Sequence, residues 1–274
     1  MDNNLALSSV VKKKQEIDMR VEQWNRELIM QGYKPITDYY SITVNENKEV
    51  VIQLRQEYWN TVGRGKLISY KFLIIPDFID YIGSSAFRNL DCLERIVVKG
   101  NTTIDDYCFA GCTSLKGIDI SKSEYLGCNI FSLTQLRSVI TNTVRARGGL
   151  FTNCDNLEKV TFTNDTLECL VGVFRECRHL KLIEFRNKTL TLEGYIADID
   201  GILLDLSYVE RFECNMFIIE HEGRDRNYYI KTSEKNHSHI IKELTRIGYI
   251  KSITKTCDEN VYKVVQCNTH KGGV

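Results

Sequence analysis

The segment FAGCTSL, residues 109–115, decides the fold because the chain repeats it. FTNCDNL runs from 151 to 157 and FRECRHL from 174 to 180, so Phe, Cys and Leu return at the same mutual spacing. A pattern that recurs in register meets a need shared by every copy, whereas an active site needs a unique place. The three segments therefore predict a repeat architecture rather than a reactive-cysteine motif.

A second pattern, L-x-x-I-x-(apolar), recurs along the middle of the chain. Its copies are LERIVV from Leu93, LKGIDI from Leu115, LRSVIT from Leu136, LEKVTF from Leu157, LKLIEF from Leu180 and VERFEC from Val209. Their first residues are separated by 22, 21, 21, 23 and 29 residues, which is the range of leucine-rich repeats. We interpret LISYKF from Leu67 as a first, degenerate copy, which predicts six to seven coils.

This stretch, residues 67–214, resembles the BspA-like (bacterial surface antigen type) class of leucine-rich repeat. The unit of that class reads approximately I-G-x-x-A-F-x-x-C-x-x-L-x-x-I-x-I-P. One coil matches it at Ile82, Gly83, Ala86, Phe87 and Leu93, and the next at Phe109, Cys112, Leu115, Ile118 and Ile120. Three coils depart from it: Leu90 replaces Cys in FRNLDCL, FSLTQL is one residue short, and the last coil lacks F-x-x-C. The resemblance implies a solenoid, and members of the family are mostly adhesive or surface-associated.

The spacing has a physical explanation. In L-x-x-I-x-I the last two apolar positions alternate as in a strand, so each copy supplies one short inward-facing strand to a parallel sheet. No copy can cover its own apolar face, and stacking on neighbours buries a continuous core. We expect Phe109, Phe131, Phe151 and Phe174 to form an aromatic stack behind the sheet. Cys112, Cys154 and Cys177 share one phase, and we expect buried thiols whose S–H groups reach backbone carbonyls.

The flanks of the repeats predict two further units. Ile17, Val21, Trp24 and Leu28 mark one face of a helix ending near Gly32, and YYSITV with EVVIQL reads as a hairpin. After the repeats, MFIIEHEG, NYYIKT, a helix over 233–248, YIKSITKTC and VYKVVQC predict a ββαββ segment. The predicted fold class is thus α+β. It comprises an N-terminal cap over 1–66, a leucine-rich-repeat solenoid over 67–214 and a small C-terminal domain over 215–274.

Composition narrows the classes of partner. Lys plus Arg and Asp plus Glu balance at 36 each, so no global field draws the protein to nucleic acid or to an anionic membrane. The N-terminus lacks the order of a signal peptide, and no apolar run approaches the roughly 20 residues of a membrane span. We therefore expect a cytoplasmic protein, in the host cytosol if it is virus-encoded. In that compartment its ten cysteines would stay reduced.

The outward positions of the predicted sheet are the candidate binding surface, because the concave sheet of a solenoid commonly binds other proteins. One column, Glu94, Lys116, Arg137, Glu158, Lys181 and Glu210, is expected to pair its own charges. The next two columns add apolar and unpaired charged groups. The candidate protein-binding residues are Arg95, Val97, Asp119, Arg137, Ile140, Lys159, Lys181, Leu182, Glu184, Arg211 and Glu213.

No motif nominates a catalytic residue, a cofactor or a metal. His237 and His239 are two residues apart and do not share a helix face, so a solvated helix start is favoured over a metal clamp. Gly63-Arg64-Gly65-Lys66 lacks the other residues of a phosphate-binding loop and is interpreted as a turn. Cys257 and Cys267 fall on the two strands of the last predicted hairpin and could face each other. In a cytosol we expect both to be reduced thiols.

Three functions remain open. The first is a non-catalytic protein-protein interaction module, such as a cytosolic or virus-encoded protein that binds or inhibits a larger complex. The second is a structural subunit of a multiprotein assembly. The third is an enzyme with its site in the C-terminal segment, using Glu220, His221 or Asp225. The expected partner is another protein, with nucleic acid disfavoured and no membrane.

Overall fold

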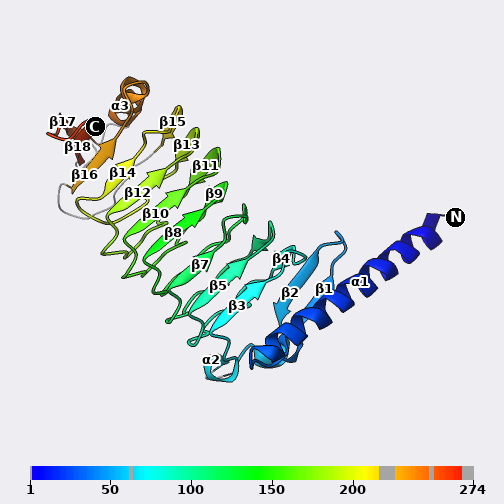
Figure 1. Cartoon of the computed structure of the whole chain (residues 1–274). Coiled ribbons are helices and arrows are strands. Elements are labelled where there is room, and N and C mark those ends of the chain that lie inside the picture. The colour runs from blue at the N-terminus through cyan, green and yellow to red at the C-terminus, as the bar shows by residue number, and fades with distance from the viewer. Residues whose placement is uncertain (1, 62–63, 216–225, 247–249, 267–274) are drawn as a thin grey trace, which may run out of the picture.

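The chain is a solenoid of short strands stacked along most of the length of the molecule (Figure 1). The computed structural model describes residues 2–61, 64–215, 226–246 and 250–266. Each coil supplies one segment to each of two parallel sheets, and back turns carry the F-x-x-C segments. The predicted leucine-rich-repeat solenoid is confirmed.

The first sheet is built from the segments that follow the L-x-x-I-x-(apolar) pattern. Its strands pair in parallel, and a bridge between Ile120 and Thr141 joins its two parts. Inward-facing residues such as Ile96, Val160 and Ile183 are fully buried. The strands of the coils are β3 (Phe72–Ile75), β5 (Arg95–Val98), β7 (Gly117–Asp119), β8 (Ser138–Thr141), β10 (Lys159–Phe162), β12 (Leu182–Phe185) and β14 (Leu203–Asp205).

A second parallel sheet runs beside the first, although the sequence predicted only one strand per coil. Residues Tyr125 and Leu126 connect its two halves through isolated bridges to Arg145 and Ile104. Inward and outward residues alternate along each strand, as Leu190 and Leu192 are buried while Thr189 and Thr191 face out. The strands are β4 (Tyr81–Ile82), β6 (Thr103–Ile104), β9 (Arg145–Ala146), β11 (Thr166–Cys169), β13 (Thr189–Leu192) and β15 (Arg211–Cys214).

The phase of the first and last copies was predicted wrongly. The register pairs Phe72 with Arg95, so the first copy begins at Tyr70, which is buried, and not at Leu67, which is 42% exposed. At the other end Leu182 pairs with Leu203, so β14 continues the first sheet. The VERFEC segment instead forms β15, which pairs with β13 in the second sheet. The 29-residue spacing between Leu180 and Val209 is long because it compares a strand of the first sheet with a strand of the second.

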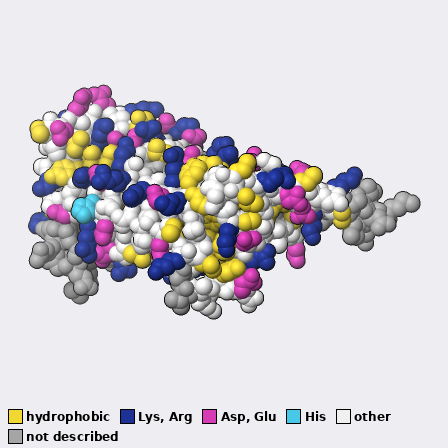
Figure 2. Space-filling model, turned by 60° about the horizontal axis from the view of Figure 1, so that its bottom comes forward, with side chains coloured by type: hydrophobic (Ala, Val, Ile, Leu, Met, Phe, Trp, Pro, Cys, Tyr) yellow, Lys and Arg dark blue, Asp and Glu magenta, His cyan; other side chains and the backbone are white. Residues whose placement is uncertain are grey.

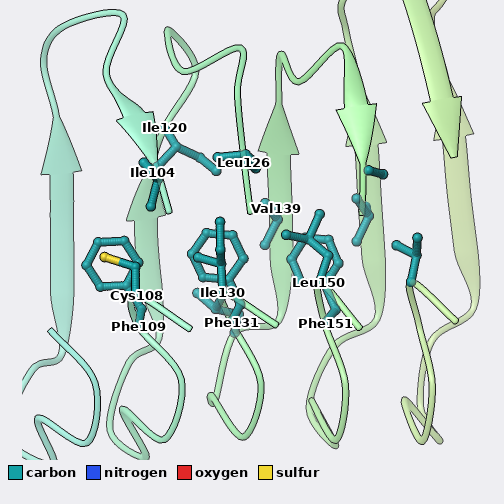
Figure 3. Packing of buried hydrophobic residues seen from close by; sticks show 14 of the residues in the cluster. Ile104, Cys108, Phe109, Ile120, Leu126, Ile130, Phe131, Val139, Leu150 and Phe151 are labelled. Carbon is teal, nitrogen blue, oxygen red and sulfur yellow. The ribbon is translucent and has the colours of Figure 1, made fainter. Parts of the chain in front are cut away.

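A stack of phenylalanine rings forms the centre of the core, as predicted (Figure 3). Successive rings from Phe109 to Phe174 are 5.5 to 6.0 Å apart between centroids and nearly parallel. Phe87 extends the stack at 5.6 Å from Phe109. Each ring is fully buried, so every coil contributes one large apolar group to a core that no single coil could form.

The back turns hold the coils together through backbone hydrogen bonds. The N–H of each stacked phenylalanine donates to the next coil, as Phe109 does to Ile130 at 3.0 Å and Phe131 to Leu150 at 3.0 Å. The residues two before and two after each of these phenylalanines have positive φ, including Gly149 and Leu133. At Gly149 a Cβ would lie 2.2 Å from Asn129 Oδ1, so glycine is required there.

The N-terminal segment closes the open end of the solenoid. Helix α1 buries Ile17, Val21, Trp24 and Leu28, and the Trp24 ring meets Phe78 edge-on at 6.4 Å. Strand β2 pairs in parallel with β4 and so extends the second sheet. The elements are α1 (Asp2–Met30), the 3-10 turns Ile36–Asp38 and Gln56–Tyr58, the antiparallel hairpin β1 (Tyr40–Val44) and β2 (Val50–Leu54), and α2 (Arg64–Leu67).

Two side chains of this segment replace groups of a missing coil. The Tyr40 ring lies 4.8 Å from Phe87 and takes the place of a preceding phenylalanine. In the coils, the carbonyl one residue after each phenylalanine accepts an N–H from the previous coil, as Ala110 does from Asn89 at 2.9 Å. The corresponding carbonyl of the first coil, that of Arg88, accepts from Nη2 of Arg64 instead. Arg64 thus supplies the donor that an earlier coil would provide.

The C-terminal segment extends the first sheet and covers the edge of the second. Strand β16 (Arg226–Lys231) pairs in parallel with β14, followed by β18 (Val261–Gln266) and the edge strand β17 (Ile250–Lys255). Helix α3 (His237–Arg246) lies beside β15 (Figure 1). His239 Nε2 accepts the Phe212 N–H at 3.2 Å, and Arg246 Nη2 donates to the Cys214 carbonyl at 3.0 Å. The predicted strand MFIIEHEG, residues 216–223, lies outside the described residues.

Candidate functional site: a groove over the second sheet

Most of the predicted binding residues do face outward on the first sheet. Arg95, Val97, Asp119, Ile140, Lys159, Leu182 and Glu184 lie on β5, β7, β8, β10 and β12, and Arg137 and Lys181 directly precede β8 and β12. Ile140 is 60% exposed. Arg211 and Glu213 were placed wrongly, because they lie on β15 in the second sheet, and Glu210 belongs to the same coil segment.

Some charges of the first sheet are paired with each other. One step of the predicted ladder is an ion pair, from Lys181 Nζ to Glu158 Oε2 at 3.5 Å, whereas Glu94 pairs with Lys71 outside the ladder. Glu184 was expected to be unpaired, which is wrong: Lys159 Nζ lies 2.8 Å from its Oε2 and Arg186 Nε 2.7 Å from its Oε1. Thr161 Oγ1 donates to the same carboxylate at 3.0 Å, and Glu184 is only 7% exposed. The Glu184 carboxylate is therefore already satisfied within this face.

The Glu184 cluster predicts a specific acid sensitivity. Burial alone would raise the pKa of Glu184, but hydrogen bonds from Lys159, Arg186 and Thr161 outweigh it and lower that pKa to about 2. The unfolded carboxyl titrates near ~4.3. The stability from these bonds is thus complete above that value and is lost as pH falls through about 2. The partners Lys159 and Arg186 are about half exposed, and solvent weakens their interaction with Glu184. We therefore expect these bonds to contribute about 2 kcal/mol to the free energy of unfolding at neutral pH.

In a Glu184→Gln variant this part of the pH dependence should disappear. Its deficit in unfolding free energy, measured by urea titration, should be largest at pH 6 and should shrink toward pH 2. Glu158→Gln is the matched control, because its partner Lys181 has a side chain that is 75% exposed. A Glu184→Gln deficit that is the same at every pH contradicts this account.

A hollowed surface lies over the second sheet. A groove of about 1020 Å³ crosses the strands from β4 to β15. The outward positions in register along it are Tyr81, Thr103, Tyr125, Arg145, Glu168, Thr191 and Glu213. Of the predicted binding residues, only Glu213 lines this groove. The groove was missed because the sequence reading gave each coil a single strand.

The groove combines aromatic rings, hydroxyls and charges. Tyr125 is 57% exposed. Arg145 forms an ion pair with Glu168 on the neighbouring strand. Burial and a hydrogen bond with Asp105 raise the pKa of Tyr81, so its hydroxyl stays protonated at neutral pH. Tyrosine and hydroxyl side chains of this kind suit contacts with peptide groups, because they offer apolar area together with hydrogen bonds.

No patch of one charge sign dominates the face of the molecule shown in Figure 2. On the face shown in Figure 2, Lys and Arg side chains lie among Asp and Glu side chains. In the part of the chain that the structure describes, no helix is long and apolar enough to cross a membrane. That face therefore presents mixed charges rather than a basic track.

The repeated cysteines are structural, as predicted. Cys112, Cys154 and Cys177 are fully buried, and each S–H donates to the carbonyl of a phenylalanine in the preceding coil. The Sγ to O distances are 3.1, 3.0 and 2.7 Å, to Phe87, Phe131 and Phe151. In the short coil FSLTQL, Thr134 takes the cysteine position and donates to Phe131 O at 2.8 Å.

These thiols should be unreactive in the folded protein. All three are fully buried, so the reagent cannot reach them, and burial also raises the pKa of Cys112 to about 12. Brief treatment with iodoacetamide, read by peptide mass spectrometry, should label the exposed Cys257 and leave Cys112, Cys154 and Cys177 unlabelled. Labelling of all three after denaturation is the control. Rapid labelling of Cys112 before denaturation contradicts the structural role.

Among the described residues, the remaining candidates for chemistry do not form a cluster. The His237 ring stacks on the Tyr262 ring, with 4.4 Å between the centroids, so it is packed rather than solvated. The His239 ring accepts a hydrogen bond from the Phe212 N–H of β15. Among the described residues there is no group of three His, Cys, Asp or Glu side chains that could hold a metal. Glu220, His221, Asp225 and Cys267 lie outside the described residues. Gly65 packs against the back turn, where a Cβ would lie 2.6 Å from Asn89 O.

Two parallel sheets joined by repeated back turns define a leucine-rich-repeat solenoid. The sequence matches the BspA type leucine rich repeat region in six copies, over residues 66–146 and 142–196. The repeat region of this chain therefore belongs to the BspA type leucine-rich-repeat family. No curated protein shows a significant match to the sequence.

Two solved structures are similar to the chain. One is a leucine-rich repeat protein from Bacteroides ovatus, with 16% identity and a TM-score of 0.36, matched over 54% of this chain and 57% of that one. The chain thus matches little more than half the length of that protein. The other is the leucine-rich repeat protein of T. pallidum, with 14% identity and a TM-score of 0.38, matched over 66% of this chain and 90% of that one.

Proposed function

We propose that this chain is a non-catalytic protein-binding module and that its partner lies in the groove over the second sheet. Solenoids of leucine-rich repeats are typical protein-interaction folds. The observation that carries the proposal is the groove itself, which spans consecutive coils and is lined by exposed Tyr125, by hydroxyls and by charges. A surface built from many coils can follow an extended partner.

The pairing of charges favours the groove over the outward face of the first sheet. Glu184 there already has Lys159, Arg186 and Thr161 as partners. A protein that bound this face would have to replace those bonds, and burying charges whose partners are displaced is costly. The groove presents Tyr125, Thr191 and Glu213, which are not part of this network of bonds around Glu184.

Two matched variants distinguish the two faces. Thr191→Arg places a long side chain across the groove, and Ile140→Arg places the same side chain on the first sheet, where Ile140 is 60% exposed. Affinity capture from the native source, with quantitative mass spectrometry, compares both with the wild type. We expect partners that persist with Ile140→Arg and fall at least tenfold with Thr191→Arg.

Thermal unfolding checks that both variants are folded. Loss of the partner with Ile140→Arg and its retention with Thr191→Arg would move the binding site to the first sheet. Reproducible capture of nothing by the wild type counts against a binding module.

A further inference from the structure

The charges of the groove are not evenly distributed along it. Its lining contains the carboxylates Asp105, Glu168, Glu193 and Glu213 and the guanidinium groups Arg145 and Arg147. In the middle, Glu168 is neutralised by Arg145. At the far end, beside β4 and β6, Asp105 accepts a hydrogen bond from the Tyr81 hydroxyl. Among the described residues, Glu193 and Glu213 form no ion pair within 4 Å, so the end of the groove near β15 keeps two uncompensated carboxylates.

These two carboxylates lie close together. Thr191 on β13 pairs in register with Glu213 on β15, and Glu193 follows two residues after Thr191. Neighbouring strands are ~4.8 Å apart and alternate residues ~6.6 Å, so the two positions are separated by roughly 8 Å. Both side chains are exposed. A single cation placed between them can therefore contact both.

An apolar hollow adjoins the carboxylates. It has a volume of about 560 Å³ and is lined by Gly148, Leu170, Val171, Glu193, Gly194 and Asn215. Val171 is 46% exposed there. Gly194 has a φ of +89°, and a Cβ at this position would lie 2.5 Å from Val171 Cγ2. Glycine at 194 thus keeps the hollow open beside Glu193.

Two cations among the described residues near this end, Arg211 and Arg246, form no ion pair with these carboxylates. Arg211 lies on β15, two residues before Glu213, and its neighbour in register is Thr189. Arg246 of α3 is engaged by Glu243 at 3.0 Å and by the Cys214 carbonyl. The end of the groove is therefore negative and borders an apolar surface, which is complementary to a basic residue flanked by aliphatic ones.

We propose that this end of the groove binds an extended partner segment that carries a Lys or Arg side chain next to an aliphatic residue. The cation lies between Glu193 and Glu213, and the aliphatic side chain enters the hollow beside Val171. The groove crosses five strand spacings from Thr103 to Glu213, roughly 24 Å, which an extended segment of about seven residues spans. The inference rests on the proposed function, since it names the partner chemistry of the same groove.

Fluorescence anisotropy with labelled peptides tests this inference. The probes are ten-residue Gly/Ser peptides with a central Leu-Arg-Leu, and the same peptide with Leu-Gln-Leu or Leu-Glu-Leu. The proteins are the wild type, the double variant Glu193→Gln/Glu213→Gln, and Glu234→Gln, an exposed carboxylate outside the groove. We expect the arginine peptide to bind best, with affinity that falls at least tenfold in the double variant and is unchanged in Glu234→Gln.

Binding of the arginine peptide should also weaken as salt rises from 50 to 500 mM, because exposed charges are screened. Equal binding of the three peptides, no binding of the arginine peptide at millimolar concentration, or full binding by the double variant each overturns the inference. The proposed function has a separate test: if Thr191→Arg abolishes capture of the native partner while the arginine peptide does not bind, the groove is the binding site and only its proposed preference for a basic segment is wrong.

Discussion

Replacing Phe131 by alanine should lower the free energy of unfolding by about 3–5 kcal/mol. The ring is fully buried and lies between Phe109 at 6.0 Å and Phe151 at 5.5 Å. Its removal takes away apolar burial and leaves a cavity with rings on both sides, which the rigid back turns cannot close. Urea denaturation followed by circular dichroism gives the change.

Leu133→Ala is the matched control, because Leu133 lies two residues further along the same back turn and is 53% exposed. Its cost should stay below about 1 kcal/mol. In a solenoid each coil contacts only its neighbours, so a weakened central coil should also broaden the transition of Phe131→Ala. A loss below 1 kcal/mol would show that the stack is not the stabilising element.

Replacing Arg64 by alanine should cost about 2–3 kcal/mol, although the residue lies outside the repeats. Arg64 is 8% exposed, and its guanidinium donates to the Arg88 carbonyl in the first back turn. The variant leaves that carbonyl without its donor and removes the side chain beside Tyr40. Urea denaturation measures the loss, and amide hydrogen exchange should show the first coil opening before the others.

The control for this prediction is Arg88→Ala. It removes the Arg88 side chain but keeps the backbone carbonyl that Arg64 contacts, so it should cost less than about 1 kcal/mol. Equal losses for the two variants would mean that Arg64 contributes only as a surface residue and does not replace a coil donor.

The sequence was sufficient to predict the features that repeat. Phe109, Phe131, Phe151 and Phe174 recur in one phase, and the structure stacks their rings. The same reasoning predicted buried thiols bonded to carbonyls, which Cys112 shows at 3.1 Å. Periodic features are predictable because each copy reports on the same environment.

The second sheet was missed for a physical reason. Several of its strands are only two residues long, as in Thr103–Ile104 and Arg145–Ala146, and so carry no visible alternation. The later strands TLEC and TLTL do alternate, and reading them in phase with RFEC would have placed Arg211 and Glu213 correctly. The groove could then have been found from the column of Thr, Tyr and charged residues that precedes each buried apolar position.

Features that occur once left no such signal. The contact of Tyr40 with Phe87 and the bond from Arg64 to Arg88 join positions far apart in the chain and follow no period. The three partners of Glu184 likewise depend on register between β10 and β12 and on the fold of the following turn. Such contacts are set by tertiary structure, which a single sequence does not display.

Hydrogen exchange on the complex tests the central claim that the partner lies over the second sheet. With the captured partner bound, amide exchange should slow across 143–147, 166–169 and 189–193, which contain β9, β11 and β13. Exchange in β5, β10 and β12 of the first sheet should not change. Protection confined to β5, β10 and β12, with none over the groove, would contradict the account.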